Sequence, residues 1–128
     1  MSKLTKVETK DAPAAIGPYS QAIKANGFMF CSGQIPLDPA TGKLVEGDVT
    51  VQAHRVFKNI QAVLAAEGKT FGDVVRSECY LADLNDFAAF NEVYKQYYVN
   101  DPKPARNTFQ VAKLPLASAV EVAVIVAL

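Results

Sequence analysis

The stretch Ala119-Val-Glu-Val-Ala-Val-Ile-Val-Ala127 decides the fold of this chain, because it is apolar at every position except Glu121. Valine and isoleucine favour β-strands, and the side chains of a strand alternate between its two faces. The face that carries Glu121 lacks the polar pattern of a surface exposed to water, so the strand is expected to be buried on both faces. The other face consists of four valines: Val120, Val122, Val124 and Val126.

Two helices are predicted to cover the valine face. Between residues 53 and 64 the apolar side chains recur at intervals of three and four, which is the period of a helix. A second helix is expected over residues 87–97, where Phe87, Phe90, Tyr94 and Tyr97 follow the same spacing. The residues expected at the helix ends are Asp48 as the first N-cap, Gly68 as the first stop, and Asn85 or Asp86 as the second N-cap.

Three further strands are predicted, over Phe28–Ser32, Val75–Leu81 and Asn107–Val111. In the second of these, the odd-numbered residues Val75, Ser77, Cys79 and Leu81 are expected to face the core. Residues 11–20, which contain two prolines and a glycine, are expected to form an ordered loop. The order strand, helix, strand, helix, strand, strand predicts an α+β fold with both helices on one face of a mixed sheet.

The second face of the sheet needs a cover that this chain does not supply. Its 128 residues fit a single domain, residues 1–128, without a third layer. That face is therefore expected to meet another copy of the chain in a closed symmetric oligomer. Loops folded over the face are the alternative.

Composition narrows the classes of function. Thirteen basic residues offset thirteen acidic ones, which argues against a broad nucleic-acid or membrane footprint. The chain has no apolar run of spanning length and no signal-peptide pattern, so a cytoplasmic location is expected. Cys31 and Cys79 form no CxxC pair and are expected to be reduced core residues. A single histidine, His54, and the absence of a glycine-rich phosphate loop predict no metal and no cofactor.

Glu121 and Arg106 are the candidate functional residues of this sequence. A lone carboxylate in a β-branched strand is costly to bury unless it is paired, hydrogen-bonded or protonated. Glu121 is therefore either functional, or it sits at an exposed strand end or bonds to backbone amides. Arg106 follows two prolines and precedes a predicted strand. Its planar guanidinium suits an anionic ligand, and a surface salt bridge is the alternative.

Several motifs of this chain, in the same order, resemble those of the Rid proteins. These reactive intermediate deaminases are also called the YjgF or L-PSP family, and the resemblance is greatest to the RidA branch, the 2-iminobutanoate/2-iminopropanoate deaminases. The match covers almost the whole chain. The motifs are Ala14-Ala-Ile-Gly-Pro-Tyr-Ser-Gln21, Ser32-Gly-Gln-Ile-Pro36, Asp83-Leu-Asn-Asp-Phe87 followed by Asn91, Pro104-Ala-Arg106, and Leu114-Pro115 with Val120-Glu-Val122.

The resemblance implies a fold and a reaction. The fold is a chorismate-mutase-like α+β domain, three copies of which form a homotrimer with a central β-barrel and a cleft at each seam. The reaction is hydrolysis of a small 2-imino acid to a 2-oxo acid and ammonia. Arg106 would grip the substrate carboxylate, while Glu121 and the Thr108 backbone carbonyl would hold the attacking water. Tyr19, Ser32 and Gly33 would line the cleft, with Asn91 as structural support.

Two departures from the family pattern bear on the substrate. Many RidA-branch proteins have Ser-Cys or Ser-Thr after the Pro-Ala-Arg motif, whereas this chain has Asn107-Thr108. The second acid of the common Glu-Ile-Glu ending is Ala123 here. These changes affect the expected substrate preference more than the expected reaction.

Two other functions are consistent with the same motifs. The first is an endoribonuclease or translation inhibitor, an activity ascribed to some family members, although the balanced charge and single histidine offer little for RNA. The second is a regulatory protein that senses a 2-oxo acid without catalysis. The sensor would need Arg106 but not Glu121.

Overall fold

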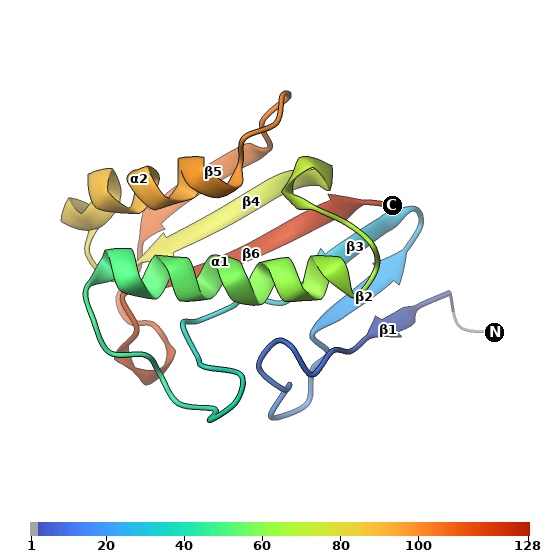
Figure 1. The fold of residues 1–128 in the computed structure, drawn as a ribbon, viewed down its shortest axis with the longest axis horizontal. Helices are drawn as coiled ribbons and strands as arrows, with labels where there is room; N and C mark the ends of the chain where they lie inside the picture. The colour runs from blue at the N-terminus through green and yellow to red at the C-terminus, as the bar shows by residue number, and fades with distance from the viewer. Residues whose placement is uncertain (1–2) are drawn as a thin grey trace.

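The computed structural model describes residues 3–128 as one mixed sheet with two helices packed on one face (Figure 1). Met1 and Ser2 lie outside the described residues. They belong to the N-terminal stretch in which no signal-peptide pattern was found in the sequence. The strands are β1 (Thr5–Val7), β2 (Ala22–Ala25), β3 (Phe28–Cys31), β4 (Val74–Leu81), β5 (Ala105–Gln110) and β6 (Val120–Ala127); the helices are α1 (Val49–Ala65) and α2 (Phe87–Tyr97), with short 3₁₀ turns at Phe71–Asp73, Leu84–Asp86 and Pro115–Ala117.

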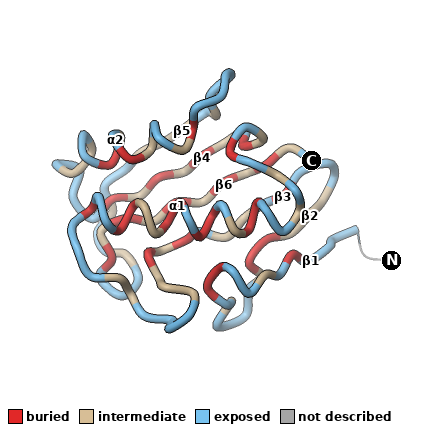
Figure 2. Tube along the Cα trace, viewed as in Figure 1, coloured by how far each residue is buried: buried red, intermediate tan, exposed pale blue. Residues whose placement is uncertain are grey.

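Strand β6 lies inside the sheet and pairs with strands that are distant from it in the sequence. The sheet order is β1-β2-β3-β6-β4-β5, and every pairing is antiparallel except that of β4 with β5. The four valines of β6 are at most 2% exposed, as predicted for residues covered by the helices. Figure 2 shows buried stretches, drawn in red, along α1 and along the central strands β4 and β6. The expected α+β class, mixed sheet and one-sided helices are confirmed.

The two helices pack against each other through aromatic side chains. Phe57 of α1 lies 5.9 Å from Phe90 of α2, measured between ring centroids, and both are fully buried. Asp48 caps α1 as predicted, since its carboxylate accepts a hydrogen bond of 3.1 Å from the backbone N–H of Val51. Gly68 has a φ of +67° just beyond the helix, the conformation expected of a glycine stop.

Asp86 occupies the N-cap position of α2, one of the two positions predicted, but its side chain makes no capping hydrogen bond. Instead, Asp83 caps the 3₁₀ turn that leads into α2, because its carboxylate accepts a 2.9 Å hydrogen bond from the backbone N–H of Asn85. The capping hydrogen bond therefore belongs to the 3₁₀ turn, and α2 continues directly from this turn.

Two strands were not predicted, and one predicted orientation is wrong. Strands β1 and β2 have only three and four residues and show no clear alternation. In β4, Val75 is 40% exposed and Val74 is buried instead, at 4%. The pairing of β4 with β6 shifts register between Val74 and Arg76, so a local bulge reverses the alternation at this end of the strand.

The face of the sheet away from the helices remains uncovered within one chain. Phe28 and Phe30 of β3 point to this face and are 41% and 44% exposed. On β6 the same face carries Glu121, Ala123 and Ile125, which are half-buried. Trimer and barrel formation stay predictions.

A strained turn leads into β6. Leu116 and Ala117 both have a φ of +56°, the left-handed region that favours glycine. Behind the turn, the Gln52 side chain accepts a 2.8 Å hydrogen bond from the backbone N–H of Ala119 and donates one of 3.0 Å to the carbonyl of Gly47. The start of α1 therefore fixes the end of the turn, which holds the two residues in their strained conformation.

We expect Ala117→Gly to stabilise the protein. Glycine adopts a φ of +56° without the clash between Cβ and carbonyl, so the free energy of unfolding should rise by about 0.5–1 kcal/mol, net of the greater freedom of the unfolded chain. Urea denaturation measures the change. Ala40→Gly, in an exposed turn without positive φ, is the matched control and should lower stability. A loss of stability in both variants would contradict the strain at Ala117.

Candidate active site

Four of the predicted site residues come together in one cavity of about 350 Å³, named here the Glu121 pocket. Glu121 reaches it from β6, Ser32 and Gly33 from the segment after β3, and Tyr19 from the loop before β2. The remaining wall is largely apolar. Its lining also includes Pro13, Ala14, Ile35, Leu37 and Pro115.

Glu121 is a half-buried acid without a partner. Among residues 3–128, no group donates a hydrogen bond to its carboxylate or forms an ion pair with it. Burial raises the pKa of Glu121, because the ionised form loses hydration. An acid with these properties is suited to exchange protons with a bound molecule.

Gly33 leaves room for this acid. A Cβ atom added at Gly33 would overlap Oε2 of Glu121 and lie only 3.0 Å from its Cδ. The position of Gly33 is fixed by its neighbour Gln34, whose backbone exchanges hydrogen bonds of 2.8 and 3.2 Å with Val122 of β6. The absence of a side chain at Gly33 therefore sets where the Glu121 carboxylate lies.

The loop around Tyr19 is held by a buried glutamine. The side chain of Gln21 accepts a hydrogen bond of 2.7 Å from the backbone N–H of Thr9 and donates to the carbonyls of Thr9 and Pro13, at 3.1 and 2.8 Å. The hydroxyl of Ser32 donates to the carbonyl of Ser20 at 2.6 Å. These bonds join the loop before β2 to the segment after β3, so Tyr19 and Ser32 have fixed places in the Glu121 pocket.

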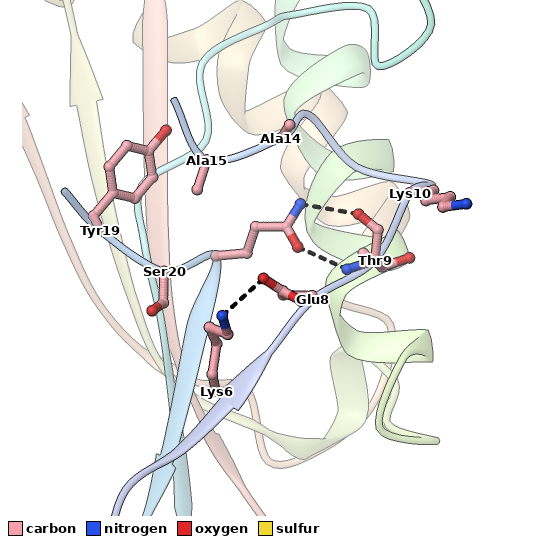
Figure 3. A pocket seen from close by; sticks show the side chains of 9 residues that line it. Lys6, Glu8, Thr9, Lys10, Ala14, Ala15, Tyr19 and Ser20 are labelled. Carbon is pink, nitrogen blue, oxygen red and sulfur yellow. Dashed lines mark hydrogen bonds and ion pairs between the residues drawn. The ribbon is translucent and has the colours of Figure 1, made fainter. Parts of the chain in front are cut away.

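A larger cavity, of about 610 Å³, adjoins the Glu121 pocket. Tyr19 and Gln21 line both cavities. The larger one also contains an ion pair between Lys6 and Glu8, with Nζ and Oε1 3.0 Å apart (Figure 3). Tyr19 therefore borders the Glu121 pocket on the side of this second space.

Arg106 lies in a separate cavity of about 380 Å³, named here the Arg106 pocket, together with Asn91, Tyr94, Tyr98, Lys103 and Pro104. Its Nη1 donates a hydrogen bond of 2.6 Å to Oδ1 of Asn91. Its guanidinium carbon lies 4.6 Å from the centre of the Tyr94 ring and 5.5 Å from that of Phe87. Helix α2 thus supports the guanidinium at three points.

Arg106 and Glu121 lie on opposite faces of the sheet. Strand β4 separates their strands, and Arg106 is paired with Ser77 of β4 whereas Glu121 is paired with Tyr80. Residues 77 and 80 are separated by an odd number of positions and so point to opposite faces. A single chain does not bring the guanidinium and the carboxylate into one pocket.

The side chain of Thr108 shares the helix-facing side with Arg106. Its hydroxyl is buried and has no hydrogen-bond partner within residues 3–128. Asn107 points the other way. With its amide oriented so that Oδ1 faces Arg76, it accepts a hydrogen bond of 2.5 Å from Nη2 of that arginine. The departure at Asn107 therefore belongs to the open face of the sheet, and Asn107 does not line the Arg106 pocket.

The contacts of Phe87 and Tyr94 with Arg106 were missed in the sequence. The signal was present, because residues 87, 91 and 94 lie on one side of a helix.

His54 is half-buried and its Nδ1 lies 2.8 Å from the Tyr97 hydroxyl, outside both pockets. The described part of the chain contains no cluster of three metal-ligating side chains and no helix long and apolar enough to cross a membrane.

Comparison with known proteins agrees with the motifs. Residues 9–128 match the family described as Endoribonuclease L-PSP. The chain belongs to this family. The Rid name applies as well, since a protein of the Rid family from Yersinia pestis, YyfA, superposes with a TM-score of 0.95 at 43% identity, covering 98% of this chain and 99% of that one.

Two other members of the L-PSP family carry more specific descriptions. The 2-iminobutanoate/2-iminopropanoate deaminase of Mus musculus is 47% identical over 116 residues, which are 91% of this chain and 85% of the mouse protein. The structure of E. coli TdcF with bound serine superposes with a TM-score of 0.90 at 40% identity, covering 97% of this chain and 98% of TdcF. The family thus includes proteins named as imine deaminases alongside its endoribonuclease description.

The raised pKa of Glu121 predicts how stability depends on pH. Well below the pKa that Glu121 has in the unfolded chain, this residue is protonated in both the folded and the unfolded state. Its burial then carries no charge penalty. As pH rises, the unfolded chain releases the proton first, so the free energy of unfolding falls until the folded pKa is passed. We expect Glu121→Gln to raise this free energy near pH 7 and to change it little near pH 3.

Urea denaturation at the two pH values measures the effect. The matched control is Glu46→Gln on the exposed surface, which should change stability by the same small amount at both. If Glu121→Gln were destabilising near pH 7, an unrecognised partner would stabilise the carboxylate.

Proposed function

We propose that this protein hydrolyses small 2-imino acids, such as 2-iminobutanoate and 2-iminopropanoate, to 2-oxo acids and ammonia. The observation that carries the proposal is a guanidinium pre-positioned by α2 and an unpartnered, half-buried acid beside a glycine. The deaminase of Mus musculus at 47% identity supports the same reaction.

Arg106 is proposed to bind the carboxylate of the substrate. Asn91 accepts a hydrogen bond from one N–H group of Nη1. The remaining guanidinium N–H groups are available for a two-point contact with a carboxylate. Serine, the molecule bound to TdcF, carries an α-carboxylate of this kind. Binding at this point orients the C=N carbon relative to the attacking water.

Glu121 is proposed to handle the protons. A water held by Glu121 and the backbone carbonyl of Thr108 attacks the imine carbon and gives a proton to the carboxylate. The C–O bond forms as the C=N π electrons move to nitrogen. Glu121 then returns the proton to nitrogen, which gives a carbinolamine. Glu121 next takes the proton of the carbinolamine hydroxyl and passes it to the nitrogen. The C–N bond breaks, its electron pair leaves with ammonia, and the deprotonated oxygen becomes the carbonyl of the 2-oxo acid. A pKa raised by burial places Glu121 nearer the pH at which both steps are efficient.

The complete site is proposed to form between two copies of the chain. Arg106 and Glu121 point to opposite faces of the sheet, so each needs its counterpart from a neighbour. The exposed phenylalanines of β3 and the apolar side chains of β6 on the open face offer the contact surface. A homotrimer, with one cleft at each seam, accommodates this arrangement. Tyr19, Ser32 and Gly33 would then line the cleft beside the substrate.

Replacement of Arg106 tests the carboxylate contact. We expect Arg106→Ala to keep the oligomeric state of the wild type and to lower kcat/KM for imine hydrolysis about 100-fold or more, because a two-point ionic contact is lost. The assay measures release of 2-oxobutanoate and ammonia from freshly generated 2-iminobutanoate. Arg55→Ala on α1, where the arginine bonds to Asn59, is the control. Equal activity of Arg106→Ala and wild type would reject the role.

Mixing two inactive variants tests whether the site is shared. Arg106→Ala and Glu121→Gln are each expected to be inactive. Unfolded together in equal amounts and refolded, about a quarter of the seams should combine an intact Arg106 with an intact Glu121 and regain activity (one half times one half). Activity that stays at the level of the separate variants would show that the two residues act in one chain or not at all.

The same measurements separate the other functions. RNA cleavage by the wild type that is lost in Arg106→Ala, without imine hydrolysis, would favour the endoribonuclease. Binding of 2-oxobutanoate that needs Arg106 but not Glu121, again without hydrolysis, would favour a metabolite sensor.

A further inference from the structure

Three side chains of α2 contact the guanidinium of Arg106, and Tyr94 is the nearest of the two aromatic ones. The Tyr94 ring centre is 4.6 Å from the guanidinium carbon, against 5.5 Å for Phe87. A guanidinium at this distance from a ring face is attracted by the negative potential of the π electrons. Asn91 binds one edge of the guanidinium, and the guanidinium carbon lies over the ring of Tyr94.

The Tyr94 ring is itself immobilised by other aromatic side chains. It stacks on Tyr98, with ring centroids 4.2 Å apart and planes inclined by 22°. Phe57 packs edge-on against it at 5.7 Å, with an interplanar angle of 80°. Tyr98 and Phe57 are almost fully buried, so the ring of Tyr94 rests on the core of the protein. A ring held this firmly can hold a charged group in place.

The hydroxyl of Tyr94 makes no hydrogen bond to Arg106. Its oxygen is buried and has no hydrogen-bond partner in the part of the chain that the structure describes. An unpaired buried hydroxyl lowers stability. The side chain therefore contributes through its ring, and a phenylalanine would supply the same contact.

We propose that Tyr94 is a positioning residue for Arg106, whose ring sets the plane of the guanidinium so that its free N–H groups face the substrate carboxylate. The inference rests on the proposed function of Arg106 in binding a 2-imino acid. A planar cation needs its orientation fixed to meet a carboxylate at two points, whereas a point charge such as lysine does not. With Asn91 alone, the guanidinium of Arg106 could rotate about a single hydrogen bond. The face of the Tyr94 ring restricts that rotation.

The proposal predicts a particular kinetic signature. The carboxylate of the substrate remains bound to Arg106 before and during the reaction, so a weaker contact lowers ground-state and transition-state binding alike. We expect Tyr94→Leu to raise KM for 2-iminobutanoate about tenfold and to leave kcat within about twofold. Tyr94→Phe should leave both constants within about twofold of the wild type.

The matched control is Tyr97→Leu. Tyr97 lies on the same helix and stacks on the same Phe57, at 5.0 Å, but it borders His54 and Lys58 rather than Arg106. Its loss should lower the melting temperature and leave KM unchanged. Tyr94→Met, whose longer and more flexible side chain adapts to the space left by the ring, is measured alongside in case Tyr94→Leu does not fold. It should raise KM in the same way.

Two results would overturn the proposal. One is an unchanged KM in Tyr94→Leu or Tyr94→Met, and the other is an equal rise of KM in Tyr97→Leu, which would reflect general loosening of α2. Calorimetric titration with 2-oxobutanoate keeps the test separate from catalysis. If the wild type hydrolyses no imine, the proposed reaction fails, yet a Kd raised about tenfold in Tyr94→Leu but not in Tyr94→Phe would still support the positioning role. A wild type that neither hydrolyses the imine nor binds 2-oxobutanoate would end both proposals.

Discussion

The alternation of side chains along β6 is the constraint on which the rest of this protein depends. One set of its residues is valine and lies under α1 and α2, where it forms the centre of the core. The other set carries Glu121 to the uncovered face. Strand β5, which β4 separates from β6, has the same alternation of side chains, and its helix-facing residues include Arg106. The period of two therefore places the two charged groups on opposite sides, and it connects the chemistry of the chain to its assembly.

The fold was largely predictable where the periodic pattern is long. The valines of β6 and the three-and-four spacing of α1 gave the core, the α+β class and the one-sided packing of the helices. Strands β1 and β2 were missed because three or four residues of mixed polarity, as in Thr5–Val7, carry too little periodic signal. At Val75 the signal was present but misleading, since a bulge reverses the alternation and only the pairing with β6 reveals it.

The site was predictable in its members more than in its geometry. Tyr19, Ser32, Gly33 and Glu121 do share a pocket, and Asn91 does hold Arg106. Their grouping followed from family motifs, because residues so far apart in the sequence show no local pattern. The division into two pockets depends on strand register, which the motifs do not contain. The same register explains Asn107, whose side chain joins Arg76 on the open face and so never meets the guanidinium of Arg106.

The close approach of Gly33 to Glu121 has a consequence for protein engineering. The hydrogen atom that stands in for a side chain at this position is all that separates the backbone from the carboxylate. Adding a methyl group there would keep the acid chemically intact while moving it, whereas mutating the acid deletes it in place. The pair offers a way to ask whether this carboxylate matters for being present or for being where it is.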